Sequence, residues 1–415
     1  MANKFCDMTG SVINWHKTTA FWYGNWDVRP EVYLNVKWES KPLEYLGVPL
    51  DSYRDNADYW KGEAETLRQK TNAWGGRDLS IFARATVCNM FLISKIWYVM
   101  QVICMSRVNV QKFHRIFAVF VWKSPWERTS RSNLFQSVSN GGLGLCHLFI
   151  RQVVSRFIFL RDQRNKFLQT VIKVRLSSRI PDFVVSTDSG MCRYVSGFLR
   201  EVIQSFEFLK VRFSLEYLAT VKRKKLYRDL RDVLLPTPLY RSMFNGGPGQ
   251  DVLKRVKKMK VKAGAKTFFF KLHSGTLPVK QWLADKGIDV PWTTNCLLCK
   301  TPETIDHVFI HCWDAVFHWD ILQRTLKKDL PITSHGIRFL CVDEDDGIPY
   351  DMVMLISLHS IWQTTMAYRH LDQNIRPVRE NFIANMRYIT EVYKQEEEPP
   401  SWLTMLEELC NLKKF

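Results

Sequence analysis

Four candidate metal ligands fall within a short stretch in the second half of the chain. Cys296 and Cys299 are separated by two residues, and His307 and Cys312 follow them. Thiolates and imidazoles are ligands that zinc prefers, and structural zinc sites hold the ion in a tetrahedron of four such groups. Because four protein ligands leave no open position for water, the pattern predicts a structural Zn²⁺ site rather than a hydrolytic one.

The fourth ligand has two interpretations. Thr301 followed by Pro302 is typical of the start of a helix. On a continuous helix, His307 and His311 would lie about 40° apart, whereas His307 and Cys312 would lie about 140° apart. Helix geometry therefore favours His311, but a thiolate has the higher affinity for zinc. We choose Cys312, expect the helix to distort or end there, and keep His311 as the alternative.

The charge of the chain indicates a polyanionic partner. Its 59 basic and 41 acidic residues give a net charge of +18. Residues 251–300 hold 11 basic and 3 acidic residues, a balance of +8. We expect these charges to contact the phosphates of nucleic acid, which implies no base readout. The predicted contacts are Lys254, Arg255, Lys257, Lys258, Lys260, Lys262 and Lys266. The run at 222–225 is a second, weaker basic patch.

Hydrophobic periodicity predicts a mainly α, multi-domain protein with a small β-rich segment at residues 1–50. An apolar stripe at helical spacing begins at Ile81, and a second stripe begins at Phe113. The first stripe consists of Ile81, Ala85, Cys88, Leu92, Ile96 and Val99. We expect Phe268, Phe269 and Phe270 to be core residues, and the same for Trp15, Trp22, Trp26 and Trp38.

Several classes of function lack their sequence signals. The first residues contain no apolar core of a signal peptide, and the apolar stretch 87–104 is interrupted by polar residues. We therefore expect no membrane partner and an intracellular location, in the nucleus or cytoplasm. No phosphate-binding loop, dinucleotide fingerprint or serine-hydrolase elbow occurs, so we expect no small-molecule substrate.

The stretch around the four ligands resembles the zinc-binding segment at the C-terminal end of LINE-type non-LTR retrotransposon reverse transcriptases. In that family a basic-aromatic helix, a Leu-Pro turn and a second helix precede Cys-x2-Cys, and a Glu, His-x4-Cys and a Trp follow. Residues 266–299 show this order, and Glu303 and Trp319 match the Glu and Trp positions loosely. The family pattern implies Cys312 as the fourth ligand. Where the family often has a Pro after the last Cys, this chain has Trp313.

The N-terminal half carries the same resemblance independently. Residues 10–26 resemble the segment that follows the catalytic carboxylates of these polymerases, which makes Lys17 similar to their proton-transfer lysine. Residues 44–50, Glu-Tyr-Leu-Gly-Val-Pro-Leu, resemble the hairpin that grips the primer end. Residues 79–98 and the turn at 140–145 resemble the thumb and the connection beyond it.

The carboxylates required for polymerisation have no counterpart in this sequence. Reverse transcriptases hold two Mg²⁺ ions with a Tyr/Phe-x-Asp-Asp turn and an earlier Asp. The similar doublet Asp345-Asp346 follows the zinc segment in a polar loop, where we do not expect a metal site. We therefore expect a truncated fragment of an RNA-directed DNA polymerase, without catalytic residues and not an enzyme on its own.

The boundaries follow from the resemblance and from the linker at 245–249. We predict a palm remnant with a primer-grip-like hairpin (1–55), a helical thumb and connection (56–165), a mixed helical connector (166–250), a zinc-binding domain (251–330) and a C-terminal helical region (331–415). The leading hypothesis is a fragment that binds RNA or DNA through its thumb and zinc segment. The alternatives are a host-used, zinc-stabilised protein-interaction scaffold and an inert pseudogene product.

Overall fold

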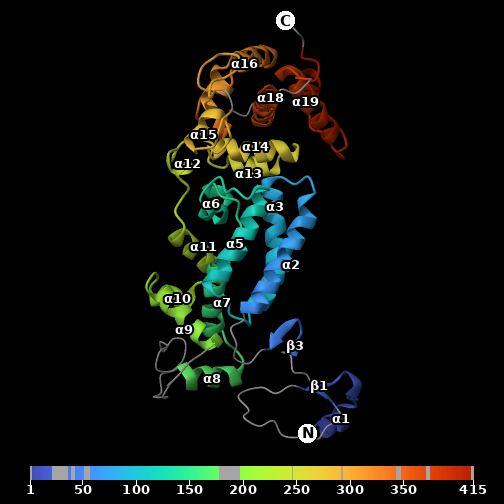
Figure 1. Ribbon diagram of the computed structural model, residues 1–415, viewed down its shortest axis with the longest axis vertical. Coiled ribbons are helices and arrows are strands. Elements are labelled where there is room, and N and C mark those ends of the chain that lie inside the picture. Colours follow the sequence, from blue (N-terminus) through green and yellow to red (C-terminus); the bar gives the residue numbers. More distant parts are fainter. Residues whose placement is uncertain are drawn as a thin grey trace. The chain divides into compact units, whose positions relative to one another are not determined.

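The computed structural model, shown in Figure 1, is mainly helical, which confirms the predicted fold class at that level. It describes residues 2–20, 36–38, 43–50, 57–176, 197–244, 246–290, 293–342, 347–370 and 374–412. The α-helices are α1 (Ala2–Thr9), α2 (Ala57–Gly75), α3 (Ile81–Val87), α4 (Ile93–Met100), α5 (Arg107–Trp122), α6 (Arg131–Phe135), α7 (Leu148–Arg161), α8 (Lys166–Leu176), α9 (Gly197–Lys210), α10 (Leu215–Thr220), α11 (Arg223–Leu234), α12 (Leu239–Ser242), α13 (Val252–Lys258), α14 (Ala263–His273), α15 (Lys280–Asp285), α16 (Trp313–Leu326), α17 (Gly336–Phe339), α18 (Tyr350–His370), α19 (Val378–Lys394) and α20 (Leu403–Leu409). Among these helices none combines the length and hydropathy needed to cross a lipid bilayer.

The chain divides into two compact units, each assembled from separate stretches of sequence. Unit 1 comprises residues 1–70, 91–116 and 148–227, and unit 2 comprises residues 71–90, 117–147 and 228–415. The four candidate metal ligands all belong to unit 2. The five predicted domain boundaries stay predictions.

The N-terminal strands are short. Strands β1 (Thr19–Ala20) and β2 (Lys37–Trp38) pair in parallel, and β3 (Leu43–Tyr45) and β4 (Val48–Leu50) form an antiparallel hairpin. Its two turn residues both have positive φ, 50° at Leu46 and 76° at Gly47, as a tight hairpin turn of this kind requires. The hydroxyl of Tyr98 on α4 donates to the Leu46 carbonyl (2.7 Å). The hairpin therefore lies where primer-grip similarity placed one, while its function stays a prediction.

The expected burial of the N-terminal tryptophans is wrong for Trp15. It lies in a single 3-10 turn, η1 (Trp15–Lys17), that buries none of its residues, and its side chain is 46% exposed. An isolated turn has no second apolar face to pack against, so a tryptophan in it stays in contact with water. Trp22 and Trp26 lie outside the described residues.

The helical stripes predicted from the sequence are confirmed. All six residues of the stripe that begins at Ile81 are buried. The residues of the second stripe are buried as well, namely Phe113, Ile116, Phe117, Phe120 and Val121. A π-helical segment, η2 (Cys88–Leu92), joins α3 to α4 within the first stripe. A π-turn widens the helix by one residue, so η2 re-aligns the apolar face while the helix continues.

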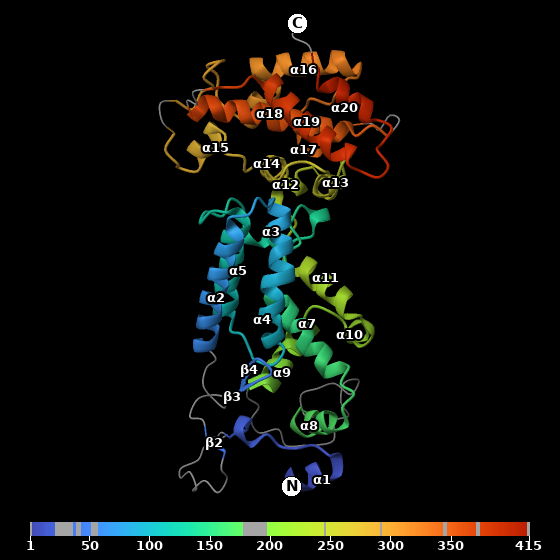
Figure 2. The same cartoon turned by 90° about the vertical axis from the view of Figure 1, so that its right-hand side faces the viewer.

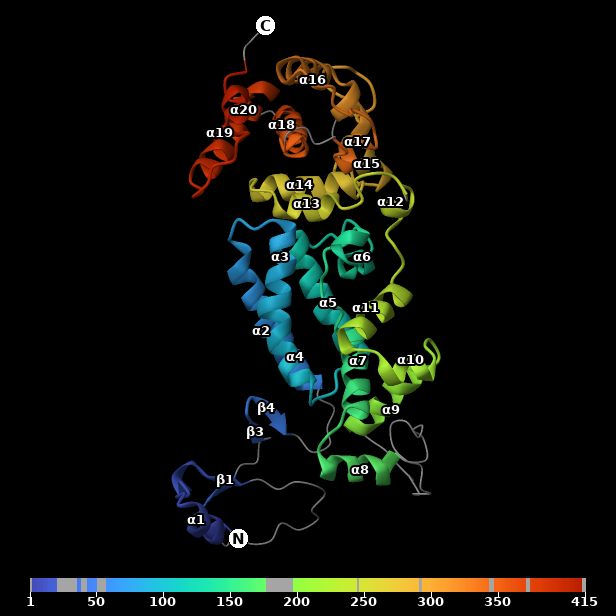
Figure 3. The ribbon, with the colours of Figure 1, turned by 180° about the vertical axis from the view of Figure 1, so that it is seen from behind.

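Helices α7 and α9 pack side by side in unit 1, as Figure 3 shows. The Arg156 side chain of α7 is 1% exposed, and each nitrogen of its guanidinium donates a hydrogen bond. Its Nε donates to Glu201 Oε2 on α9 (2.7 Å), and its other nitrogens donate to the carbonyls of Gln101 and Met100. A buried guanidinium with all these partners fixes α7, α9 and the end of α4 together.

Helix α18 is the centre of the C-terminal part of unit 2 and packs against α14, α16 and α19 (Figure 2). Its residues from Met352 to Ile361 are all buried, as expected for a helix with neighbours on every side. The predicted core residues Phe268, Phe269 and Phe270 of α14 are also buried, which confirms that prediction.

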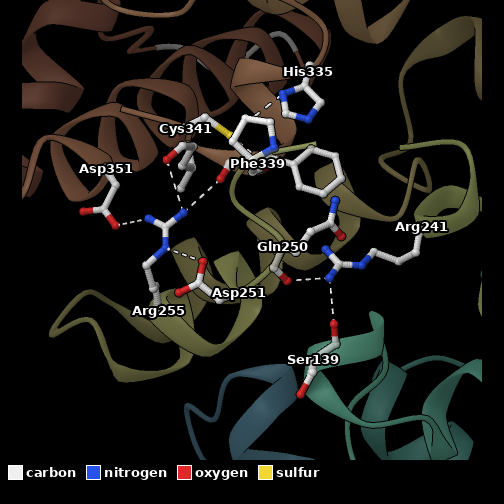
Figure 4. Close-up of polar contacts among 11 residues, drawn as sticks. Ser139, Arg241, Gln250, Asp251, Arg255, His335, Phe339, Cys341 and Asp351 are labelled. Carbon is white, nitrogen blue, oxygen red and sulfur yellow. Dashed lines mark hydrogen bonds and ion pairs between the residues drawn. The ribbon is translucent and has the colours of Figure 1, made fainter. Parts of the chain in front are cut away.

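A tight turn at residues 140–144 is held by a buried arginine, shown in Figure 4. A side chain at Gly142 would collide with the carbonyl oxygen of Gln136, so only glycine fits there. The Arg241 guanidinium donates to the carbonyls of Ser139 and Gln250. The two carbonyls lie on separate stretches of sequence, so one side chain connects them within unit 2.

Candidate metal centre

The four predicted ligands come together in space. One donor atom from each of Cys296, Cys299, His307 and Cys312 lies within 4.8 Å of all the others. The Sγ atom of Cys312 is 4.0 Å from that of Cys296 and 3.8 Å from that of Cys299. Two sulfurs on a tetrahedral zinc, each about 2.3 Å from the ion, would be about 3.8 Å apart. The cluster therefore has the size and the donor atoms that zinc requires.

The first two cysteines are presented by a tight turn. Cys296 and Thr301 are joined by a backbone hydrogen bond (N to O, 2.8 Å), and Lys300 N donates to the carbonyl of Cys296 (3.0 Å). Lys300 closes the turn in the left-handed region, with φ 62°. Backbone amides of Leu298 and Cys299 also point at the Cys296 sulfur, which favours a thiolate there.

A π-helical turn brings the last two ligands to the same side. The segment η5 (His307–His311) is closed by a hydrogen bond from Cys312 N to the His307 carbonyl (2.6 Å), five residues earlier. Cys312 itself is extended, with φ −66° and ψ 140°. A regular α-turn would have placed His307 and Cys312 about 140° apart. The predicted distortion of the helix is thus present, and it removes the geometric argument for His311.

His307 is oriented by a side chain that the sequence prediction used differently. The Thr301 hydroxyl lies 3.0 Å from His307 Nδ1, and the buried Nε2 has no hydrogen-bond partner among the described residues. In most metal-ligating histidines one ring nitrogen has a hydrogen-bond partner and the other faces the ion. Nδ1 and Nε2 of His307 fit these two roles. The predicted role of Thr301 as a helix N-cap is wrong, because Thr304 Oγ1 instead accepts from the His307 amide (3.0 Å). Pro302 and Glu303 instead pair with the chain just before Cys296, so the helical segment starts later.

The electrostatics of the cluster favour a cation. The contact between the thiols of Cys296 and Cys312 lowers the pKa of Cys296 and raises that of Cys312. One proton is therefore shared between two buried sulfurs that lie side by side. A divalent ion would replace that proton and allow all the sulfurs to be thiolates.

Two buried contacts hold the cluster to the rest of unit 2. The Glu303 carboxylate accepts from the Lys280 backbone amide (3.0 Å) and forms an ion pair with Arg369 at the end of α18. The Trp319 indole donates to the carbonyl of Phe309 inside the π-turn (2.8 Å). Glu303 and Trp319, which matched the family pattern loosely, are thus positioning residues of the cluster.

The remaining predicted site residues fall into different places. His311 is exposed and is not part of the cluster, which favours Cys312 as the fourth ligand. Lys17 is exposed at the end of η1, and no contact of the described residues bears on its predicted role. Asp345 and Asp346 lie outside the described residues.

The predicted phosphate contacts separate into two groups. Arg255 is an internal clamp, since it pairs with Asp251 and Asp351 and donates to the carbonyls of Phe339 and Leu340 (Figure 4). Lys260, Lys262 and Lys266 are also engaged, with Glu396, with Asn385 and with the carbonyl of Lys257. Lys254, Lys257 and Lys258 are exposed and have no ion pair within the described part of the chain.

Comparison with known proteins identifies the region that holds the cluster. Residues 237–319 match the family model described as zinc-binding in reverse transcriptase. The matched region contains all four candidate ligands and the basic stretch before them. It confirms the resemblance to non-LTR retrotransposon reverse transcriptases and confirms zinc as the expected cofactor. We refer to residues 237–319 as the matched segment.

A curated relative extends the similarity to transposons. The chain is 30% identical over 162 residues to the Transposon TX1 uncharacterized 149 kDa protein of Xenopus laevis. The match covers 35% of this chain and 12% of that protein. The match thus spans about an eighth of the length of this relative.

Sequence reasoning missed the residues that support the cluster from a distance. Arg369 lies 66 residues after its partner Glu303, and no local pattern connects the two. The Lys280 ammonium donates to the Asn295 carbonyl (2.8 Å) and so stabilises the turn, whereas the sequence around Lys280 indicates only a positive charge. The local signal for Arg369 is its helical spacing after the apolar Trp362 and Met366, which places the three residues on one face of the helix.

Proposed function

We propose that this chain binds nucleic acid through the matched segment, which is similar to the zinc-binding region of reverse transcriptases and is held in shape by one Zn²⁺ on Cys296, Cys299, His307 and Cys312. The partner is RNA or DNA, which the protein contacts at the phosphates. Because RNA and DNA occur in the nucleus and the cytoplasm, we propose one of these compartments as the location. The ion is structural, since four protein ligands complete its coordination. The observation that carries the proposal is a row of free lysines within that segment.

The row, which we call the lysine ridge, consists of Lys254, Lys257 and Lys258 on α13. The spacings of three and four residues place these side chains on one face of the helix. All three are exposed, and the apolar residues Val252, Leu253 and Val256 bury the opposite face. Unpaired ammonium groups on a rigid, well-packed helix are suited to contact successive phosphates without sequence preference.

We further propose that the chain does not polymerise nucleotides by itself. The 415-residue sequence contains no Tyr/Phe-x-Asp-Asp turn to hold catalytic Mg²⁺. Purified protein should therefore not extend a primer on an RNA or DNA template with Mg²⁺ or Mn²⁺. Template-dependent incorporation above that of heat-inactivated protein would contradict this part of the proposal.

The test of nucleic-acid binding is a salt titration of labelled single-stranded RNA followed by fluorescence anisotropy. Reversing the charge of the lysine ridge, by Lys254→Glu, Lys257→Glu and Lys258→Glu together, should remove about three phosphate contacts. At ~0.7 per contact, the slope of log K against log salt should become less negative by about 2. Affinity should fall by about 100-fold near 0.1 M salt, for all sequences alike.

A matched variant controls for the change in net charge. Lys123, Lys286 and Lys327 are also exposed residues of unit 2, and their replacement by Glu changes the charge by the same amount. This control should keep most of the affinity and the salt slope. Both triple variants should retain one zinc per chain. Equal losses in the two variants, or a ridge variant that binds as the parent does, would overturn the ridge as a binding surface.

One observation favours the scaffold alternative. Trp313 and Phe317 at the start of α16 are 73% and 63% exposed, directly after the last zinc ligand. Val316 between them is exposed as well. An apolar patch of this kind is typical of protein-interaction sites. RNA affinity that is independent of salt and of the lysine ridge, together with loss of a protein partner on Trp313→Ala, would favour the scaffold.

A further inference from the structure

A large cleft in unit 1 has no role in the function described so far. It encloses about 1120 Å³, more than the roughly 300–1,000 Å³ of a site for one drug-sized ligand. Its walls come from the start of α5 and from α7 and α9, which pack together (Figure 3). Every residue that lines it belongs to unit 1, so it shares no residue with the lysine ridge.

Cationic groups stacked on aromatic rings line the cleft. The Arg107 guanidinium lies over the ring of Phe149, 5.2 Å from its centroid, and that of Arg212 lies over Phe208 at 3.7 Å. Phe149 and Phe208 contact each other edge to face, so the two stacks are neighbours. Such a guanidinium keeps an open outer face for a base and free N–H groups for phosphate.

The charge balance of the cleft favours an anion. Arg107, Arg200 and Arg212 form no ion pair within the described residues. Of the two acidic residues in the lining, Glu201 is neutralised by the buried Arg156. Glu207 is the remaining acidic group in the lining, against these three arginines, of which Arg212 also donates to the Phe208 carbonyl (2.7 Å).

A buried acceptor without a partner gives a second, independent indication of a ligand. Gln152 on α7 is 5% exposed, and its Nε2 donates to the Met105 carbonyl (3.3 Å). Its Oε1 is buried in the cleft lining and has no hydrogen-bond partner among the described residues. A buried acceptor without a hydrogen bond is destabilising, so a ligand that donates a hydrogen bond there would be favoured.

We propose that this cleft binds single-stranded RNA. Unpaired bases can stack on the arginine planes, phosphates can bridge to the three arginines, and a ribose 2′-hydroxyl supplies the donor for Gln152 Oε1. A duplex keeps its bases inside and offers no face for stacking, and DNA lacks the hydroxyl. The inference goes beyond the proposed function, because it assigns a second site in the other unit.

The first test reverses the charge of the stacked arginines in the full chain. Arg107→Glu with Arg212→Glu should weaken binding of a labelled single-stranded RNA of about 12 nucleotides by at least tenfold near 0.1 M salt. The matched control is Lys112→Glu with Lys166→Glu, two exposed lysines of unit 1 that do not line the cleft. This control should stay within about threefold of the parent, as expected for screened surface charges.

The outcomes separate this site from the lysine ridge. If only the ridge variant loses affinity, the cleft proposal is overturned and the proposed function stands. If only the cleft variant loses affinity, the cleft stands and the proposed function fails. Equal losses in the cleft variant and its control would show general charge attraction and would also overturn the cleft.

The second test addresses the 2′-hydroxyl without changing the protein. Replacing the RNA by a 2′-O-methyl RNA of the same sequence removes the donor and keeps the phosphates and bases. Binding should weaken by about 2- to 10-fold, the effect of one hydrogen bond. In Gln152→Met, which retains the side-chain volume, this difference should disappear. Equal binding of RNA and 2′-O-methyl RNA by the parent protein would overturn the assignment of Gln152 to ribose.

Discussion

The metal cluster and the helical pair α18–α19 lie in the same unit and are held by different forces. Between Cys296 and Cys312 the chain forms a turn, an irregular stretch and a π-turn, and a few polar side chains decide its shape. Helices α18 and α19 instead pack through apolar residues such as Leu355, Phe382 and Met386, all fully buried. The difference shows that one unit can combine a stretch that depends on an ion with a core that depends on the hydrophobic effect.

Loss of zinc should separate the two regions most clearly. In Cys299→Ser, or after chelation of the parent protein, the stretch from Cys296 to Cys312 should lose protection in hydrogen exchange while α18 and α19 keep theirs. Structural zinc contributes on the order of 10 kcal/mol in isolated finger peptides, so the local effect should be large. His311→Ala is the control and should retain one zinc per chain in elemental analysis. Zinc that is lost in His311→Ala but retained in Cys312→Ala would reverse the choice of the fourth ligand.

A cavity between α18 and α19 should have the opposite effect, a lower stability of the fold without loss of zinc. Phe382→Ala removes a fully buried ring that contacts His318 edge to face. It should lower the free energy of unfolding by about 3–5 kcal/mol, measured by denaturant titration, with unchanged zinc content. Phe317→Ala is the matched control, because this phenylalanine is exposed and its loss should change stability by less than about 0.5 kcal/mol. Zinc release in Phe382→Ala would show that the two regions are not energetically separate.

The ion pair that joins the two regions should have an intermediate effect. Glu303→Gln removes the buried counter-charge of Arg369 and of the Lys280 ammonium, which lies 3.9 Å from the carboxylate. It should cost about 3 kcal/mol in stability. Replacing Arg369 by Met in the same chain should restore part of that loss, since the uncompensated charge is gone. If the double variant is less stable than Glu303→Gln alone, the pair is not the link between the regions.

Acid should lower the stability of the helical core by a smaller amount. Burial lowers the pKa of His318 to about 4, whereas an unfolded histidine titrates near ~6.5. The unfolded state therefore takes up a proton first, so this stability is present above about pH 6.5 and is lost as the pH falls towards 4. Between pH 7 and 5 the loss should be about 2 kcal/mol.

The comparison of His318→Leu with the parent isolates this effect, because acid also displaces zinc from both proteins equally. The stability difference, measured by urea titration at each pH, should move in favour of the variant as the pH falls. A difference that does not vary between pH 7 and 5 would assign no role to the protonation of His318.

The parts that were predictable from sequence depend on local chemistry. Four soft ligands within 17 residues predict a metal site because few other patterns gather thiols and imidazole so closely. The stripes from Ile81 and Phe113 predict buried helix faces because periodicity alone defines a face. Even the distortion at Cys312 follows from helix geometry once that residue is taken as a ligand.

The parts that were not predictable depend on partners far along the chain. Arg255 lies in a basic stretch that is typical of phosphate contacts, and only the fold brings Asp351 beside it. Thr301 has the sequence of an N-cap, but the ring of His307 competes for its hydroxyl. The pairing of Glu303 with Arg369 and the unmet acceptor of Gln152 likewise arise from tertiary packing, which no local pattern encodes.

The contacts of Arg241 have a consequence for how the chain folds. Its guanidinium donates to the carbonyl of Gln250 and to that of Ser139, which lies 102 residues before Arg241. The Tyr240 hydroxyl donates to the Gly141 carbonyl (2.6 Å) across a similar separation in sequence. Such distant pairs must close a long loop before they gain any stabilisation. During synthesis, residues 117–147 therefore leave the ribosome well before these partners exist. Residues 71–90 already contact this stretch, for example through Asn89 and Gly144, but the surface that packs against residues 228–415 has no partner until they follow. This interval is therefore the vulnerable step for aggregation and for chaperone binding.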